Sequence, residues 1–363
     1  MKEEHLEPGW CPDCGKTPYD IKKGKFVCCS KCGRCKGIDT SEPLTEKERK
    51  LIMTHHTTED GWNLNLHADE IDEDEYKNIK ANTIDIGDNV EISDDVEIIC
   101  DRLVIGEGTV ITGGTKIMCK NCHIGKNNFI NGAWIEAALN AGNTSIHIGN
   151  ECLILQGARL NCNGKLVIGS DVNIGQNVEI WTHASSMDVF NGYPYVKSPV
   201  TIGNHVWITA GTTIMPGTTV GNHIIIGNKS IVNKDLPDGC FAAGAPVKII
   251  KEKCFPKKLD FKNKEEILLD CITEYTKLLD YKPFNAILQQ KANSLTIIMW
   301  AEDRGITYFD LENRCMHGDI NECSEDFRDF LRYRGIKIFT GKPFKSIKPS
   351  WYTLATKKKG LFK

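Results

Sequence analysis

The chain has 363 residues, enough for two or three domains and at least one large hydrophobic core. Charged residues make up 26% of it and the formal net charge is −3, so no broad positive field for nucleic acid or for anionic membrane surfaces is expected. The first twenty residues contain no apolar run and no segment approaches about 18 consecutive apolar residues, so neither a secretory signal nor a membrane span is predicted.

The first segment of the chain is rich in cysteine. Two Cys-x-x-Cys pairs, Cys11 with Cys14 and Cys32 with Cys35, are separated by 17 residues. This spacing predicts a four-thiolate zinc site with a structural role, because four thiolates leave no open position on the metal. An iron–sulfur cluster is the alternative, since Cys29, Cys32 and Cys35 also form a Cys-x-x-Cys-x-x-Cys run. Cysteines spaced as metal ligands, 16 in the whole chain, favour a reducing cytoplasm over a secreted disulfide framework.

A hydrophobic period of six residues runs from Ile84 to Val232. Aliphatic residues recur at this step, often followed by glycine, and the longest unbroken series is Ile202, Ile208, Ile214, Val220, Ile226 and Val232. Each short strand would point two side chains inward, and glycine or asparagine would turn the corner after it. Neither an α-helix nor a β-sandwich has this period. The repeat therefore predicts a three-sided parallel β-helix of roughly seven coils.

Cysteines within the repeat need no chemistry of their own. Cys122 and Cys152 occupy the small inward position, two residues before Ile124 and Ile154. Cys119 and Cys122 form a further Cys-x-x-Cys pair, but no second pair lies near them. We expect these thiols to pack as small hydrophobic groups.

One interruption of the repeat indicates where function is concentrated. Between Ile180 and Ile202 the chain makes an excursion that a regular prism does not require, and His183 begins it. An imidazole is suited to accept a proton from a hydroxyl group near neutral pH. Asp188, in the same excursion, is a candidate for orienting that imidazole.

The last coils contain a series of characteristic segments: Ile202–Ile208, Met215–Gly217, Val220–Gly221, Ile226–Val232, Lys234–Pro237 and Ala243–Lys248. These segments resemble the hexapeptide-repeat O-acetyltransferases, and within them the galactoside and maltose acetyltransferase branch. The resemblance implies a left-handed coil and a homotrimer with active sites in the grooves between subunits. It also implies acetyl-CoA as acyl donor, a sugar or nucleotide sugar as acceptor, and His183 as general base.

Further site residues follow from the same resemblance. Positions that match those near coenzyme A are Trp207, Ala210, Gly211, Gly227, Asn228, Lys234, Lys248 and Lys251. Trp207 lies between inward-facing residues and would point outward, and the lysines would contact the nucleotide phosphates. Candidates for acceptor binding are Asn161, Asn163 and Tyr193. The stretch around Asn161 departs from the family pattern, which leaves the acceptor open.

After the repeat, apolar residues return to helical and strand spacing. A helix is predicted over Glu265–Leu279, strands over Leu295–Trp300, Ile306–Phe309 and Ile336–Phe339, and a helix capped by Ser324. The predicted organisation is a cysteine-rich segment at 1–40, a helical and acidic connector at 41–83, the β-helix at 84–253 and a small α/β domain at 254–363.

Three other functions remain possible from the sequence. Amino-sugar N-acetylation would use the same fold and base, and a trimeric scaffold would use the fold alone. A trimeric β-helix carbonic anhydrase would bind zinc through three histidines, but the histidines present do not have that spacing. His205 and His223 lie at nearly equivalent places one coil apart, which favours stacking or surface exposure over convergence on a metal.

Overall fold

The computed structural model describes residues 78–138, 141–142 and 144–348, together with the backbone of three short strands before them. Those strands are β1 (Ile21–Lys23), β2 (Phe26–Cys28) and β3 (Cys35–Gly37), which form an antiparallel sheet in the order β1-β2-β3. The predicted metal ligands Cys11, Cys14 and Cys32 lie outside the described residues, and of Cys35 only the backbone is described.

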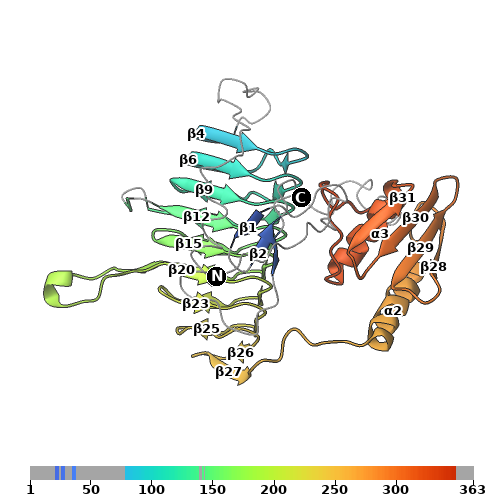
Figure 1. Cartoon of the computed structure of the whole chain (residues 1–363). Coiled ribbons are helices and arrows are strands. Elements are labelled where there is room, and N and C mark those ends of the chain that lie inside the picture. The colour runs from blue at the N-terminus through green and yellow to red at the C-terminus, as the bar shows by residue number, and fades with distance from the viewer. Residues whose placement is uncertain are drawn as a thin grey trace.

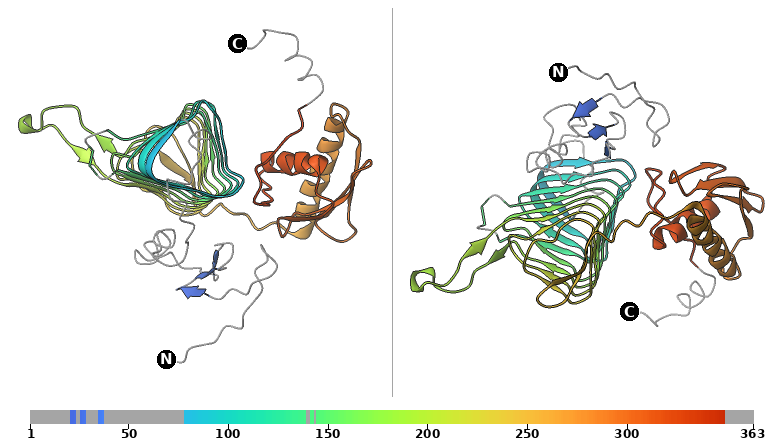
Figure 2. Two further views of the ribbon diagram at one scale, coloured as in Figure 1. Left: turned by 90° about the horizontal axis from the view of Figure 1, so that it is seen from above. Right: turned by 60° about the horizontal axis from the view of Figure 1, so that its bottom comes forward.

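The main body is a parallel β-helix with three faces, as the repeat predicts; Figure 1 shows the stacked coils and Figure 2, from above, their triangular outline. Face 1 stacks eight parallel strands, and its last strand pairs with an antiparallel one. The strands of face 1 are β5 (Glu91–Ile92), β7 (Val110–Thr112), β10 (Phe129–Asn131), β13 (Leu153–Ile154), β16 (Asn173–Ile174), β21 (Trp207–Ile208), β24 (Ile225–Ile226), β26 (Phe241–Ala243) and the antiparallel β27 (Lys248–Lys251).

The other two faces belong to one sheet, because the long strand β6 (Glu97–Ile105) pairs with members of both. Face 2 contains β8 (Lys116–Met118), β11 (Trp134–Glu136), β14 (Arg159–Asn161), β17 (Glu179–Ile180), β22 (Thr213–Ile214) and β25 (Ile231–Val232). Face 3 contains β4 (Ile79–Ile86), β9 (Asn121–Ile124), β12 (Ser145–Ile148), β15 (Lys165–Ile168), β20 (Val200–Ile202) and β23 (Thr219–Val220).

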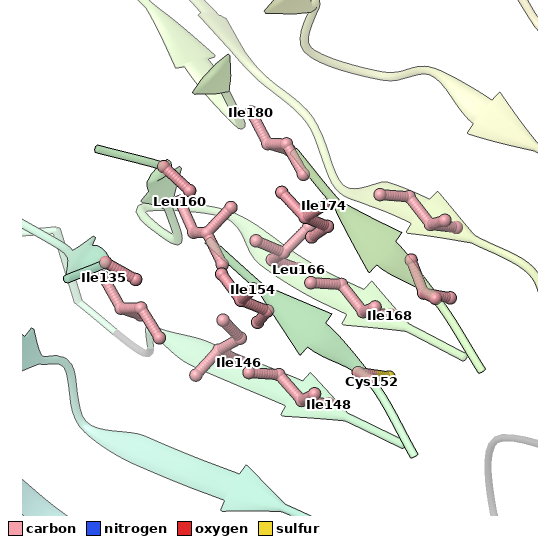
Figure 3. Packing of buried hydrophobic residues seen from close by; sticks show 14 of the residues in the cluster. Ile135, Ile146, Ile148, Cys152, Ile154, Leu160, Leu166, Ile168, Ile174 and Ile180 are labelled. Atoms are coloured by element: carbon pink, nitrogen blue, oxygen red, sulfur yellow. The ribbon is translucent and has the colours of Figure 1, made fainter. Parts of the chain in front are cut away.

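The interior of the prism is a stack of aliphatic side chains. Ile154, Leu160 and Ile168 come from the three faces of one coil and point toward one another (Figure 3). All three are fully buried, and each lies above its equivalent in the next coil. Because every coil contacts only its neighbours, stability in such a fold accumulates coil by coil.

Each turn passes three corners, named here by the faces they join. Corner 3–1 shows most clearly why the turns have their sequence. Its residues Asp171, His205 and His223 have φ values of 54°, 56° and 56°, in the left-handed region where most side chains are disfavoured. The neighbouring Asn204 and Asn222 offset this cost, because the amide oxygen of each accepts a hydrogen bond from a backbone N–H of the preceding coil.

A separate small domain follows the β-helix and has its own core (Figure 1). It consists of α2 (Phe261–Leu279), the antiparallel strands β28 (Ala286–Gln290), β29 (Thr296–Ala301), β30 (Gly305–Asp310) and β31 (Cys315–Gly318), and α3 (Glu322–Tyr333). None of the helices in the described part of the chain is long and apolar enough to span a membrane.

Two local predictions in this domain were wrong. Ser324 does not cap α3; Asn321 does, and the Ser324 hydroxyl completes the capping box by accepting from the Asn321 backbone N–H. Ile336–Phe339 is not a strand, because the Ile338 carbonyl accepts from the Arg328 guanidinium and not from a neighbouring strand. Strands β28 and β31 were not predicted.

The chain after α3 runs back along the β-helix at corner 3–1. We call residues 336–348 the strap. The Lys337 ammonium binds the carboxylate of Asp171 and donates to the Glu151 carbonyl at 2.8 Å, and the amide of Asn89 donates to the Gly341 carbonyl at 3.1 Å. The strap thus joins the small domain to the edge of the prism.

Candidate active site

Two excursions leave the prism from corner 2–3. The long one, residues 181–199, connects β17 to β20, and a shorter one, of which residues 137–138, 141–142 and 144 are described, lies between β11 and β12. The prediction of a single interruption was therefore wrong. The shorter excursion was missed because it is only slightly longer than one repeat of the sequence pattern. Figure 2 shows the long excursion projecting from the prism on the side opposite to the small domain.

The long excursion is a hairpin with an apolar tip. Its strands β18 (His183–Ala184) and β19 (Val196–Lys197) pair antiparallel, with His183 opposite Lys197, and the 3₁₀ turn η2 (Val189–Asn191) lies at the tip. Phe190 is 98% exposed, and Tyr193, a predicted acceptor ligand, is exposed nearby. An apolar surface held away from the body of one chain is typical of a contact with another molecule.

Asp188 does not contact His183. Its carboxylate caps η2 by accepting from the backbone N–H of Phe190 at 2.9 Å and from the side-chain amide of Asn191 at 2.6 Å. The structure thus gives this residue a role in shaping the hairpin tip.

The partner of His183 is Asn161, at the end of β14 in the coil above. The Asn161 side-chain oxygen lies 2.9 Å from Nδ1 of His183. Sequence reasoning had placed Asn161 among the acceptor ligands and had missed this contact. The register explains it, because Asn161 ends its strand at corner 2–3, where His183 leaves the next coil.

The surroundings of Asn161 determine the tautomer of His183, that is, which ring nitrogen carries the hydrogen. The backbone N–H groups of Thr182 and Asn163 donate to Oδ1 of Asn161 at 3.4 and 3.3 Å, and its Nδ2 donates to the carbonyl of Glu136 at 3.5 Å. Backbone donors cannot be reversed, so Oδ1 is an acceptor and Nδ1 of His183 must carry its proton. Nε2 is then left with its lone pair, as a general base requires.

Buried polar groups support this arrangement. The Thr182 hydroxyl, which is fully buried, lies 2.8 Å from Oδ1 of Asn161 and accepts from the Gly164 N–H at 2.9 Å. Asn163, the other predicted acceptor ligand, instead accepts from the Ala138 N–H in the shorter excursion at 2.6 Å. The Trp181 indole lies edge-on to the imidazole, with ring centroids 6.2 Å apart. His183 therefore lies on a rigid support with an aromatic side wall.

The residues predicted to bind coenzyme A lie mostly at a different corner. Ala210 and Gly211 connect β21 to β22, and Gly227 and Asn228 connect β24 to β25, so all four are at corner 1–2. Lys234 follows β25 at corner 2–3, and Lys248 and Lys251 lie on β27. Within one chain, face 2 separates the corner 1–2 residues from His183.

Trp207 faces outward from face 1, as predicted, and is 52% exposed. It lines a shallow hollow of about 260 Å³ together with His205, His223, Ile224, Ile225, Phe255 and Pro256. The imidazoles of His205 and His223 are stacked with centroids 4.6 Å apart, which confirms the expected stacking. No group of three potential metal ligands was found among the described residues.

Curated proteins with similar sequences identify the family. The chain is 33% identical to galactoside O-acetyltransferase of Escherichia coli over 33% of its own length and 61% of that protein. It is 32% identical to galactoside O-acetyltransferase of Lactococcus lactis over 36% of its own length and 62% of that protein. Protein CapG of Staphylococcus aureus is 30% identical over 36% of this chain and 85% of its own length. The chain belongs to the hexapeptide-repeat acyltransferases.

The family assignment made from the sequence is thereby confirmed. No protein-family model matches the chain. The chain spans about half to three-fifths of the first curated relatives it matches. Among solved structures, the chain matches the polySia specific acetyltransferase NeuO at 21% identity over 56% of this chain and 99% of that one, with a TM-score of 0.33. A hexapeptide-repeat acetyltransferase from Vibrio cholerae matches at 17% identity over 56% and 88%, with a TM-score of 0.30.

Proposed function

We propose that this protein transfers an acetyl group from acetyl-CoA to a hydroxyl group of a sugar or nucleotide sugar, with His183 as general base. The observation that carries the proposal is the 2.9 Å contact between Nδ1 of His183 and the amide oxygen of Asn161. It leaves Nε2 free to take a proton at the base of a projecting hairpin.

The chemistry follows from that lone pair. Nε2 accepts the proton of the acceptor hydroxyl while its oxygen attacks the thioester carbonyl. The tetrahedral intermediate then expels the coenzyme A thiolate, which recovers the proton from the imidazolium. A positioned general base contributes about 10²–10⁴-fold to such a step. Asn161 is a positioning residue, because it holds the imidazole and fixes its tautomer without touching substrate.

The placement of the remaining residues supports a trimer with shared sites. His183 lies at corner 2–3, whereas Ala210, Gly211, Gly227 and Asn228 lie at corner 1–2. A threefold axis alongside face 2 would bring corner 2–3 of one subunit against corner 1–2 of the next, as a heterologous closed ring requires. Acetyl-CoA would then lie in that groove, with Lys234, Lys248 and Lys251 toward its phosphates.

Two surface features agree with this arrangement. Apolar side chains are partly exposed on face 2, at Trp134 and Ile231, and just after its strand β22, at Met215. The strap occupies corner 3–1, which is the corner that this trimer leaves free. The exposed tip of the hairpin would reach the neighbouring subunit.

The acceptor would lie beside His183 and Trp181, because an indole face packs well against a sugar ring. Tyr193 could contribute from the hairpin tip. Asn161 and Asn163 are occupied by the contacts described above, so we assign them to positioning and not to acceptor binding.

The test is the release of coenzyme A thiol from acetyl-CoA with a panel of sugars, amino sugars and nucleotide sugars. His183→Ala should lower the rate by about 10²–10⁴-fold. His317→Ala is the matched control, because His317 is an exposed histidine on β31 of the small domain and should leave the rate unchanged. Equal rates for His183→Ala and the native protein would overturn the proposal and favour a scaffold; activity with amines alone would favour N-acetylation.

A further inference from the structure

Three side chains project from one extended segment beside the candidate active site. Over residues 179–183 the side chains alternate between half-buried and fully buried, and the half-buried ones are Glu179, Trp181 and His183. Alternation of this kind places residues i, i+2 and i+4 on the same side of an extended chain. We call these three residues the outer row. The outer row leads from face 2 to the imidazole at corner 2–3.

Trp181 interacts with both other members of the outer row. Its indole Nε1–H donates to Oε2 of Glu179 at 3.3 Å. Its ring lies edge-on to the imidazole of His183, with centroids 6.2 Å apart and an interplanar angle of 61°. The backbone N–H of Trp181 donates to the Ile214 carbonyl at 3.0 Å, which fixes the main chain but not the rotation of the side chain. The hydrogen bond to Glu179 restricts that rotation.

Glu179 has a second possible partner that it does not bind. Strands β14 and β17 place Arg159 directly opposite Glu179, and opposite charges at such positions are expected to pair. The Arg159 guanidinium instead lies over the Trp134 ring, 5.2 Å from its centroid, and in the described part of the chain no ion pair joins it to Glu179. The Glu179 carboxylate is therefore directed along its own strand, toward the indole.

The neighbouring coils complete the wall around Trp181. The register places Asn161, which holds His183, in the coil above, and Met215, which is 37% exposed, in the coil below. The wall thus offers an indole and a thioether beside a general base. A sugar ring has C–H groups on its faces and hydroxyl groups at its edge, so a ring packed against this wall would bring a hydroxyl toward Nε2.

We propose that Glu179 is a positioning residue that holds the Trp181 indole in the orientation that binds the sugar ring of the acceptor. This inference rests on the proposed function. Glu179 acts through the indole and does not itself touch the acceptor. An indole that is already fixed loses little rotational freedom when the sugar packs against it, and this favours binding. Acceptor affinity, and not proton transfer, should therefore depend on Glu179.

Steady-state kinetics test this dependence, with the sugar of the panel that releases coenzyme A thiol fastest as acceptor. Glu179→Ala should raise the KM for that sugar about 3- to 10-fold, the effect of losing one hydrogen bond, and should leave kcat and the KM for acetyl-CoA within about twofold. Glu179→Gln keeps an oxygen that accepts from the indole N–H and should behave like the native protein. Glu312→Ala is the matched control, because Glu312 forms an exposed pair with Lys264 in the small domain.

Trp181→Phe separates action through the indole from direct contact with the acceptor. This variant keeps an aromatic ring but lacks the N–H group, so it should raise the acceptor KM about as much as Glu179→Ala. In the Trp181→Phe background, Glu179→Ala should have no further effect, because both changes remove the same hydrogen bond. A further rise in the double variant would place Glu179 in contact with the acceptor and would overturn the proposal.

The indole N–H resonances give a readout that needs no activity. The chain has seven tryptophans, and Trp181→Phe identifies the signal of Trp181 in the isotope-labelled full chain. We expect this signal to move upfield in Glu179→Ala and to stay near its native position in Glu179→Gln and Glu312→Ala.

Several results would overturn the inference while leaving the proposed function intact. They are an unmoved indole signal in Glu179→Ala, an unchanged acceptor KM, an equal rise in KM for Glu179→Gln, and an altered oligomeric state with a raised KM for acetyl-CoA. A native protein that acetylates no sugar of the panel would contradict the proposed function itself. The indole signal would then still report whether Glu179 holds Trp181.

Discussion

The β-helix and the small domain fill their interiors in opposite ways. In the β-helix the large buried side chains are aliphatic, and the buried polar ones are small residues such as Thr109, Thr115 and Asn128. In the small domain, α3 buries the charged residues Asp326, Arg328 and Asp329. A repeated fold can place the same aliphatic group in every coil, whereas a single-copy domain that must hold an irregular segment depends on particular polar contacts.

Those contacts hold the strap. The Arg328 guanidinium pairs with Glu325 and donates to the carbonyls of Ile338 at 3.1 Å and Pro343 at 2.6 Å. Asp326 accepts from the Tyr275 hydroxyl at 2.6 Å and from the Lys282 ammonium at 2.8 Å. Loss of one buried side chain should therefore destabilise the small domain strongly, whereas in the β-helix the loss of stability should be confined to neighbouring coils.

The largest expected effect is that of Arg328→Ala. It removes a fully buried cation and leaves Glu325 and three strap carbonyls without their donor. We expect the small domain to lose about 3–5 kcal/mol of stability. Hydrogen exchange should rise through α3 and the strap while the β-helix stays protected. Arg304→Ala, which breaks an exposed pair with Glu322, should cost less than about 1 kcal/mol.

Removal of one aliphatic group from the β-helix should have the next largest effect. Ile154 is fully buried on β13 between β10 and β16. Ile154→Ala should cost about 2–5 kcal/mol through lost burial and the cavity left behind. Exchange should rise in the neighbouring coils only, and the half-buried Leu153 on the same strand provides a milder control. Equal loss of protection in every coil would contradict the coil-by-coil picture.

Asn161 is the polar residue of the prism for which we predict a catalytic consequence. Asn161→Ala should lower kcat by about 10- to 100-fold with little change in the KM for acetyl-CoA, because the imidazole loses its orientation. Asn161→Asp keeps the acceptor for Nδ1 and should restore most of the rate. It should also move the acidic limb of the pH–rate profile upward, since a carboxylate stabilises the protonated imidazole. Loss of fold in both variants, or an unchanged pH profile, would indicate a structural role alone.

The junction between the two regions should give the smallest effect. Burial alone would raise the pKa of Asp171, but the hydrogen bond from His205 and the charge of Lys337 lower it below its usual value. A depressed carboxylate pKa stabilises the folded state above pH 3.8, and this contribution is lost as the pH falls through the lowered pKa. Lys337→Met should weaken docking of the strap by about 1 kcal/mol at neutral pH and reduce its acid sensitivity. Exchange at corner 3–1 measured between pH 2.5 and 7 would show either change.

The same contrast decides what could be predicted from the sequence. The β-helix could be predicted because one side-chain position repeats, so Ile202 to Val232 already indicated the coil. The excursion that carries His183 was predicted because it breaks that repeat. The Asn161 contact was not, since it depends on which residues of different coils meet at one corner, and that register follows from the lengths of the intervening excursions.

The small domain was harder to predict for a related reason. Ile336–Phe339 alternates like a strand, yet its carbonyl partner is a buried arginine, which no local pattern reveals. Asn321 and Ser324 both favour a helix start, and only their mutual hydrogen bonds show which one is the cap. The sequence analysis assigned Ala210 and His183 to one site. Within one chain, however, Ala210 lies at corner 1–2 and His183 at corner 2–3.

We propose that each active site joins His183 of one subunit to corner 1–2 of another. Mixing two inactive variants, His183→Ala and Ala210→Glu, by refolding them together at equal concentration tests this arrangement. Ala210 is exposed, so the glutamate should block an anionic cofactor without disturbing the core. In a shared-site trimer about a quarter of the sites would combine an intact His183 with an intact corner, so about a quarter of the native rate should return. A mixture that stays as inactive as its two components, despite forming mixed trimers, would contradict the account.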